Sequence, residues 1–184
     1  MQEECLRNLP PLQGLIEKPM RGVEWHFINR KAREVMADVL FHGATFEPDM
    51  RTLTDEQAKA IARASGVDVR SKQIRAWRAS TGGWFIVDEV VGKHDYIPFA
   101  LALDASGAVK GIEILEYREA YGDQIRNPEW QKQFVGKNSG TKLQLEKNIR
   151  NISGATLSCK HVTDGVERLL VTYDLVLKHA IPGH

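Results

Sequence analysis

Four apolar runs lie close together in the middle of this 184-residue chain, and they constrain its fold more than any other feature. Each run has the length and the β-branched and aromatic content of a strand. The four runs are 74–79, 84–91, 96–103 and 109–117. A parallel pair of strands needs a crossover of roughly a dozen residues, whereas these runs are joined by much shorter connections. The middle of the chain therefore predicts an antiparallel sheet.

Residues typical of turns separate the predicted strands. Gly82 and Gly83 lie between the first two, and the segment 104–107, which ends in glycine, is typical of a hairpin turn between the last two. Pro98 has no N–H to donate to a neighbouring strand. We therefore expect the strand that contains Pro98 either to lie at an edge of the sheet or to begin after that residue.

Two helices are predicted ahead of the sheet. The first spans 29–43, and its apolar residues recur at three- and four-residue spacing at Ala32, Val35, Met36, Val39 and Leu40. The second spans 54–64, where Thr54 and Gln57 have the spacing of a capping box and Gly66 follows the end of the helix.

Two further helices are predicted after the sheet. A short one spans 127–134, with Pro128 in its first turn, and a long one runs from about 158 to 180. One face of the long helix is apolar, at Val162, Val166, Leu169, Leu170, Tyr173 and Val176. Together these elements predict an α+β fold, in which a twisted antiparallel sheet is flanked by helices and the long C-terminal helix packs on it. We expect residues 1–70 to form an N-terminal arm with helices and residues 71–184 to form the main domain.

Composition and motif content exclude several classes of function. Lys and Arg number 25 and Asp and Glu 24, so the formal net charge of +1 leaves no basic excess for nucleic-acid binding. The six histidines lack the spacing of a metal site, and Cys5 and Cys159 are expected to be two separate thiols. No apolar run of about 18 residues predicts a transmembrane segment, and no export signal is recognised in the chain as given. A P-loop, a dinucleotide-binding glycine motif and a catalytic constellation are also missing from the sequence.

The segment 151–159, at the start of the long helix, is the most informative for function. Three small residues let its backbone approach a bulky group closely, namely Ser153, Gly154 and Ala155. The first N–H groups of the helix have no partner inside it, and the helix dipole adds partial positive charge there, which suits a phosphate. From the residues alone, the simpler interpretation is an ordinary helix start capped by Thr156 or Ser158.

A family resemblance favours the phosphate. Residues 153–158 read S-G-A-T-L-S and resemble the S-G-A-T-x-[TS] motif of the FMN-binding domain family. That family includes the flavin-carrying G subunit of the bacterial Rnf complex, the C subunit of the sodium-translocating NADH:quinone reductase and the flavin domain of nitrous-oxide reductase regulators. In these proteins the motif threonine is joined to FMN by a phosphoester bond, which a flavin transferase forms with FAD as donor and Mg²⁺ as its metal. The matching residue here is Thr156.

Two earlier segments extend the resemblance, which covers about 77–177. Residues 111–122 are similar to a strand of the family that leads into a Glu-x-x-Gly turn, and the matching residues are Glu119 and Gly122. Residues 130–137 resemble the family's W-x-x-Q-F-x-G-K segment and begin with Trp130.

One position departs from the family pattern. The family usually has an acidic residue three positions before the motif serine, and here that residue is Arg150. The change leaves the Thr156 hydroxyl in place. The Arg150 guanidinium either pairs with the FMN phosphate, for which its geometry is suited, or is simply solvated.

The resemblance implies an electron carrier that holds phosphothreonyl-FMN, rather than a stand-alone enzyme with catalytic residues or a metal of its own. The implied cofactor-binding residues are Thr156, Ser153, Gly154, Ala155, Leu157, Ser158, Glu119, Tyr121, Gly122, Trp130 and Arg150, and further candidates for contact with the flavin ring are Phe134 and Trp84. The implied partners are a flavin transferase and a membrane or periplasmic redox protein, in the periplasm or otherwise outside the cytoplasm and associated with a membrane. Two alternatives remain open: a sensory or scaffold module of the same fold with little or no flavin, and a reductase that binds FMN reversibly.

Overall fold

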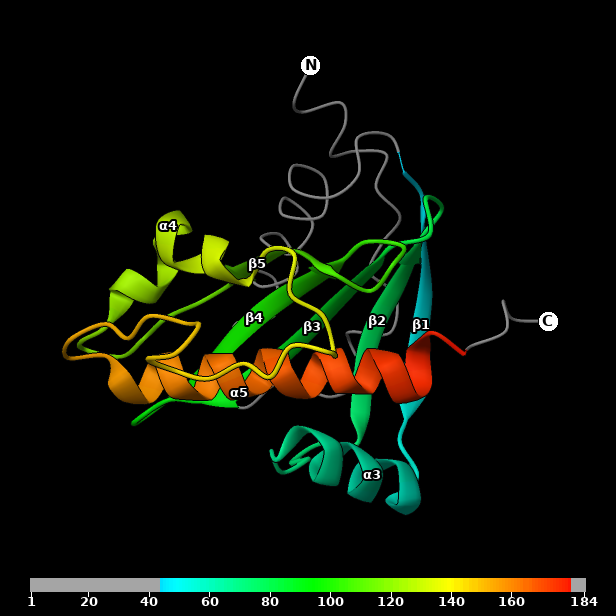
Figure 1. The fold of residues 1–184 in the computed structure, drawn as a ribbon, viewed down its shortest axis with the longest axis horizontal. Coiled ribbons are helices and arrows are strands. Elements are labelled where there is room, and N and C mark those ends of the chain that lie inside the picture. Colours follow the sequence, from blue (N-terminus) through cyan, green and yellow to red (C-terminus); the bar gives the residue numbers. More distant parts are fainter. Residues whose placement is uncertain (1–43, 180–184) are drawn as a thin grey trace.

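The computed structural model of the chain describes residues 44–179, which form an antiparallel sheet and helices (Figure 1). The five strands lie in the order in which they follow in the chain: β1 (Phe46–Thr52), β2 (Gln73–Ala79), β3 (Trp84–Val91), β4 (Tyr96–Leu103) and β5 (Val109–Ile114). The helical elements are α3 (Asp55–Ser65), η2 (Asp123–Arg126), α4 (Pro128–Gln131), η3 (Lys132–Phe134), α5 (Thr156–Thr172) and η4 (Tyr173–Leu177). The predicted α+β fold is confirmed, whereas the helix predicted over 29–43 lies outside the described residues.

The four predicted strands are all present, and a fifth strand precedes them. β3 and β4 have the predicted bounds, and Trp84 pairs with Leu103 at one end of this hairpin while Val91 pairs with Tyr96 at the other. The sequence does not predict β1, because Pro48 and several charged residues interrupt any strand pattern there. Within residues 44–179, β1 pairs with β2 alone and is an edge strand, where a proline is tolerated.

The expectation for Pro98 is wrong, because β4 begins before Pro98 and lies between β3 and β5. The proline is accommodated because β5 ends at Ile114, before the predicted end at Tyr117. The Pro98 carbonyl accepts the N–H of Leu115 at 2.9 Å. Since the N and C=O of one strand residue point toward the same neighbour, the missing N–H of Pro98 faces the place where the ladder with β5 stops.

The two longer helices predicted within residues 44–179 are formed with small shifts of their ends, whereas the short helix predicted over 127–134 is an α-helical turn, α4, followed by a 3-10 turn, η3. The Thr54 hydroxyl accepts the N–H of Gln57 at 3.1 Å, and the Gln57 side chain accepts the N–H of Thr54 at 2.9 Å, so the capping box of α3 is complete. α5 begins at Thr156, earlier than predicted, and continues into η4, a π-helical turn. β1 and α3 join the same sheet and core as the later elements, and the domain boundary near residue 70 stays a prediction.

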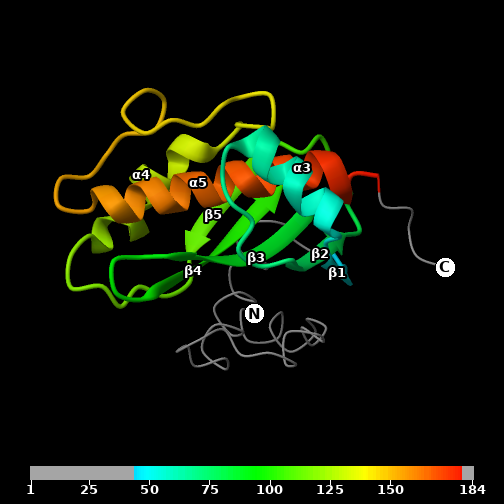
Figure 2. The ribbon, with the colours of Figure 1, turned by 90° about the horizontal axis from the view of Figure 1, so that it is seen from below.

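α3 and α5 pack on the same face of the sheet and enclose the main core (Figure 2). The predicted apolar face of α5 is buried at Val162, Val166, Leu169, Leu170, Tyr173 and Val176. The start of α5 lies beside the end of β3, where His161 Nδ1 contacts the carbonyl of Val91. The end of α5 lies beside the turn after β4, where a Cβ atom on Gly107 would clash with the ring of Tyr173. The first residues of α5 are thereby held at the β3–β4 turn.

Candidate functional site

Thr156 is the first residue of α5, and its side chain is exposed. The N-cap residue is Ala155, and within the described residues no side-chain hydrogen bond caps the helix. The alternative in which Thr156 or Ser158 caps the helix is therefore wrong. Because no side chain satisfies the first N–H groups of α5, they are open to an anionic group at the positive end of the helix dipole.

Asn151 holds the Thr156 hydroxyl. Its Nδ2 atom donates to Thr156 Oγ1 at 3.0 Å and to Glu146 Oε1 at 3.3 Å. Because a carboxylate can only accept, the contact with Glu146 fixes which end of the Asn151 amide carries the N–H groups. The Thr156 oxygen thus accepts one hydrogen bond, and its own proton is directed elsewhere. The Oδ1 atom of Asn151 is buried and has no hydrogen-bond partner among the described residues.

The turn after β5 packs directly on the motif. Gly122 has a φ of 95°, and a Cβ atom at this position would lie 2.6 Å from Ala155 Cβ and 2.7 Å from Tyr117 Oη. Tyr117 Oη donates to the backbone carbonyl of Tyr121 at 2.5 Å and lies 3.0 Å from Ser158 Oγ. Burial raises the pKa of Tyr117, although its hydrogen bond with Ser158 opposes this, so the hydroxyl remains a donor at neutral pH. The structure therefore brings together three predicted site residues, Gly122, Ala155 and Ser158.

The Glu119 side chain links the turn after β5 to the β3–β4 connection by hydrogen bonds. Its Oε1 atom accepts the N–H of His94 at 2.7 Å and the N–H of Asp95 at 3.1 Å. Burial alone would raise the pKa of Glu119, but these N–H groups outweigh it and hold the pKa below its usual value. The carboxylate is therefore charged at neutral pH, and its contact with FMN stays a prediction.

Trp130 and its neighbours support the segment that leads into the motif. The Trp130 ring is buried edge-on against Phe134, with centroids 5.2 Å apart, and its Nε1 atom donates to the carbonyl of Arg150 at 2.8 Å. The Gln133 side chain accepts the N–H of Arg150 at 2.7 Å and donates to the carbonyl of Trp130 at 2.9 Å. The backbone of Arg150 is thus fixed while its side chain is exposed. Direct contact of Trp130 or Arg150 with flavin stays a prediction.

Exposed apolar surface also occurs at this site. Tyr121 is 82% exposed and Leu157 is 43% exposed, and they belong to the two segments that meet where Gly122 touches Ala155. By contrast, the other proposed ring contacts, Phe134 and Trp84, are buried. Trp84 also lies at the end of β3 that is remote from the start of α5, so it does not belong to this site.

Comparison with known families agrees with this geometry. Residues 92–171 match the family that is described as the FMN-binding domain. The match includes both the turn that ends at Gly122 and the motif with Thr156. This confirms the predicted resemblance and supports a flavin-binding role in electron transfer. No curated protein matches the chain.

Between residues 44 and 179, no helix is both long and apolar enough to cross a membrane. Within the same residues, no group of three or more His, Cys, Asp or Glu side chains could hold a metal ion. Cys159 is a free, buried thiol whose pKa is raised by burial, whereas Cys5 lies outside the described residues.

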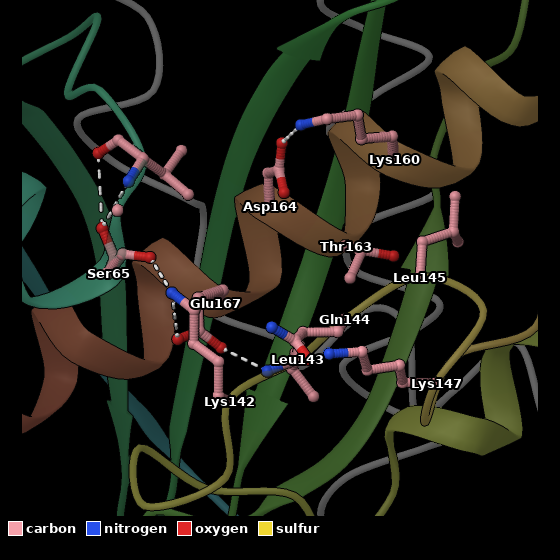
Figure 3. Close-up of a pocket in the computed structure, with 12 residues that line it drawn as sticks. Ser65, Lys142, Leu143, Gln144, Leu145, Lys147, Lys160, Thr163, Asp164 and Glu167 are labelled. Atoms are coloured by element: carbon pink, nitrogen blue, oxygen red, sulfur yellow. Dashed lines mark hydrogen bonds and ion pairs between the residues drawn. The ribbon is translucent and has the colours of Figure 1, made fainter.

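A groove of about 400 Å³ lies along one face of α5 (Figure 3). The groove begins one turn of the helix after Thr156. Its volume lies in the range of small-molecule sites. Lys142 pairs with Glu167 at 3.4 Å, and Lys160 pairs with Asp164 at 2.5 Å. Because these charged groups already pair with one another, the groove is a weaker candidate for an apolar ring than the surface of Tyr121 and Leu157.

Sequence reasoning missed three residues that organise the site, Tyr117, Gln133 and Asn151. Tyr117 and Ser158 are 41 residues apart, so no local pattern could pair them. Gln133 is the glutamine of the W-x-x-Q-F segment, so the resemblance of that segment to the family was a signal for it. Asn151 lies five residues before Thr156, and an amide so close to the motif hydroxyl was the signal for it.

Proposed function

We propose that this FMN-binding domain carries FMN through a phosphoester to Thr156 Oγ1 and relays electrons between redox partners. The observation that supports this most is the exposed Thr156 hydroxyl at an N-terminus of α5 that no side chain caps. FMN, when bound, supplies one- and two-electron chemistry, and the protein supplies position and electrostatics.

The attachment is a phosphoryl transfer from FAD, catalysed by a flavin transferase. A bond forms between Thr156 Oγ1 and phosphorus, the pyrophosphate bond of FAD breaks, AMP leaves, and the hydroxyl proton passes to a base of the transferase. Asn151 donates to Thr156 Oγ1 and so orients the oxygen while the proton points elsewhere. The exposure of Thr156 gives a second protein access to this oxygen.

The residues around Thr156 fit the parts of FMN. The phosphodiester keeps one negative charge, which the start of α5 stabilises by about 0.3–1 kcal/mol, and the exposed Arg150 guanidinium can pair with it. The unpartnered Oδ1 atom of Asn151 can accept a hydrogen bond from a ribityl hydroxyl. Tyr121 and Leu157 offer apolar surface for the ring.

A covalent link matters most where free flavin is scarce, because it keeps the cofactor at high local concentration. We therefore propose a location outside the cytoplasm, in the periplasm, with a membrane or periplasmic redox protein as partner. Two rival functions retain the fold. Arg150 in place of the family's acidic residue favours a sensory or scaffold module with little flavin, and an exposed apolar surface also suits a reductase that binds FMN reversibly.

Intact-protein mass spectrometry after coexpression with a flavin transferase tests the attachment. The wild-type chain is expected to gain the mass of FMN minus one water and to stay yellow after denaturation. Thr156→Ala should abolish the gain, whereas Ser153→Ala, which removes another exposed hydroxyl of the same motif, should retain it. An unmodified wild-type mass beside a modified positive control would favour the sensory module, and colour released by denaturation would favour the reductase.

Flavin fluorescence of the attached protein tests the ring position. Leu157→Ala is expected to change the fluorescence, because Leu157 is proposed to contact the ring. Leu175→Ala is the matched control, since Leu175 is also 43% exposed but lies in η4 at the other end of the helix. Equal effects of the two substitutions would contradict this position for the ring.

A further inference from the structure

The sheet has a second apolar face, opposite α3 and α5. Side chains alternate along β3, so that Ile86 joins the core beneath α5 while Phe85 and Val87 point the other way. The buried apolar residues on this second face are Phe46, Trp77, Ala79, Phe85, Val87, Ala100 and Ala102. None of them belongs to the core cluster beneath α5, and the rings of Trp77 and Phe85 lie 6.0 Å apart.

The helices within residues 44–179 do not account for this burial. Their buried apolar side chains all belong to the cluster on the α5 side, as shown by Ile61, Ile125, Trp130, Phe134 and Val162. Figure 2 shows α3 and α5 together on one side of the strands. Residues 180–184 are too few to cover a sheet. The cover of the second face must therefore come from residues 1–43 or from another chain.

We propose that residues 29–43 form an amphipathic helix that packs on this second face. The apolar stripe of the segment is made by Ala32, Val35, Met36, Val39 and Leu40. A helix over 29–43 is about 22 Å long at 1.5 Å per residue. The five strands span about 19 Å at a spacing of about 4.8 Å. The segment therefore has the length and the apolar stripe that this face requires.

The position at which the chain enters the sheet supports residues 29–43 as the segment that covers the second face. Phe46 pairs with Ala79, and the N–H of Thr45 donates to Ser80 Oγ at 3.1 Å. Only Ala44 and Thr45 separate residue 43 from the first residue of the edge strand β1. A helix that ends at residue 43 thus ends beside one edge of the sheet, from which it can cross the face.

The charges of the second face and of the proposed helix are also complementary. Glu89 follows Val87 on the second face, and Glu113 lies opposite Ala100 in the β4–β5 register. The first turn of the proposed helix carries the basic residues Arg30, Lys31 and Arg33. Long basic side chains at the margin of an apolar stripe can reach such carboxylates while their stems cover apolar surface.

Hydrogen exchange of the full chain, read by mass spectrometry, tests the proposal from the helix side. Amides of 29–43 in the wild-type chain are expected to exchange at least roughly tenfold more slowly than an unstructured peptide. Ala32→Asp, in the stripe, should remove this protection. Ala37→Asp, the same change on the opposite side of the helix, should leave it. Exchange of 29–43 at the rate of an unstructured peptide in the wild-type chain would overturn the proposal.

The same measurement tests the contact from the sheet side. Val87→Ala should speed exchange in 29–43, whereas Ile86→Ala, at the neighbouring position that faces α5, should not do so selectively. The wild-type protection must also be independent of protein concentration, with a solution mass of one chain. Protection that is lost on dilution from a dimer would show that a second copy covers the face and would contradict the proposal.

Discussion

The two ends of the C-terminal helix differ in what their side chains do. At the start of α5, Ser153, Gly154, Thr156 and Leu157 are exposed, and the helix has no side-chain cap. At the other end, Leu169, Leu170 and Leu177 are almost completely buried, and Tyr173 packs on the turn after β4. The first end leaves polar groups available for a ligand, whereas the second contributes apolar burial to the fold.

Flavin attachment and stability therefore depend on different ends of this helix. A helix start without a cap leaves about 0.5–2 kcal/mol of possible stabilisation unrealised. The packing at the other end offsets that loss many times over, since each fully buried apolar side chain contributes about 1.5–3 kcal/mol. Substitutions at the start of α5 should therefore change flavin attachment more than stability, and substitutions at its other end should do the reverse.

Leu170→Ala should have the largest effect on stability. Leu170 is 1% exposed in the core beneath α5, so its truncation should lower the free energy of unfolding by about 2–5 kcal/mol. Thr156→Ala should change it by less than about 0.5 kcal/mol, because Thr156 is exposed. Urea denaturation of both variants measures this. A larger loss of unfolding free energy for Thr156→Ala than for Leu170→Ala would contradict this difference between the two ends of the helix.

Gly122→Ala should lower the stability of the fold and also slow flavin attachment. The added Cβ would lie 2.6 Å from Ala155 Cβ at a φ of 95°, so the turn after β5 must move away from the motif. We expect a loss of about 1–3 kcal/mol in unfolding free energy and slower flavin attachment. Gly154→Ala is the control, because its φ is 83° but nothing lies within 4 Å of the added Cβ. Equal slowing of attachment by both variants would point to backbone strain rather than to the contact with Ala155.

Asn151→Ala should slow attachment without a comparable loss of stability. A neutral hydrogen bond contributes about 1 kcal/mol, which corresponds to roughly a fivefold change in rate. The rate of mass gain with purified transferase and FAD measures the effect. Asn151→Asp replaces the donor by an acceptor and should not restore the rate. An unchanged rate for Asn151→Ala would show that Asn151 does not orient Thr156.

Glu119→Gln should have the smallest effect, and it should depend on pH. The N–H groups of His94 and Asp95 hold the pKa of Glu119 below its unfolded value, so the charged carboxylate stabilises the fold above about pH 4.3. This contribution is lost as the pH falls through the lowered pKa. The difference in Tm between wild type and variant should therefore be present at pH 7 and shrink below about pH 4. A difference that grows on acidification would contradict the assignment.

Much of the fold could be predicted from the sequence because its signals are local. The capping box of Thr54 and Gln57, the hairpin of β3 and β4 and the apolar face of α5 all depend on residues close in sequence. β1 could not be predicted, because an edge strand does not need an alternating apolar pattern and tolerates Pro48. The error at Pro98 arose because the place where β5 stops is a long-range property.

The candidate site could be predicted only in part, because several of its contacts join residues that are far apart in sequence. The motif residues from Ser153 to Ser158 are contiguous, and the family resemblance indicates them directly. The contact of Gly122 with Ala155 and the hydrogen bond between Tyr117 and Ser158 join segments that are far apart in sequence. The burial of Trp84 and the exposure of Tyr121 likewise follow from the assembled sheet and not from their own residue types.

Tryptic peptide mapping of the denatured, flavin-attached protein tests directly whether FMN is attached to Thr156. Cleavage after Arg150 and Lys160 releases one peptide, 151–160, which contains Thr156 together with Ser153 and Ser158. We expect this peptide alone to be yellow and fragmentation to place the FMN phosphate on Thr156. Flavin on either serine, or on any other peptide, would contradict it.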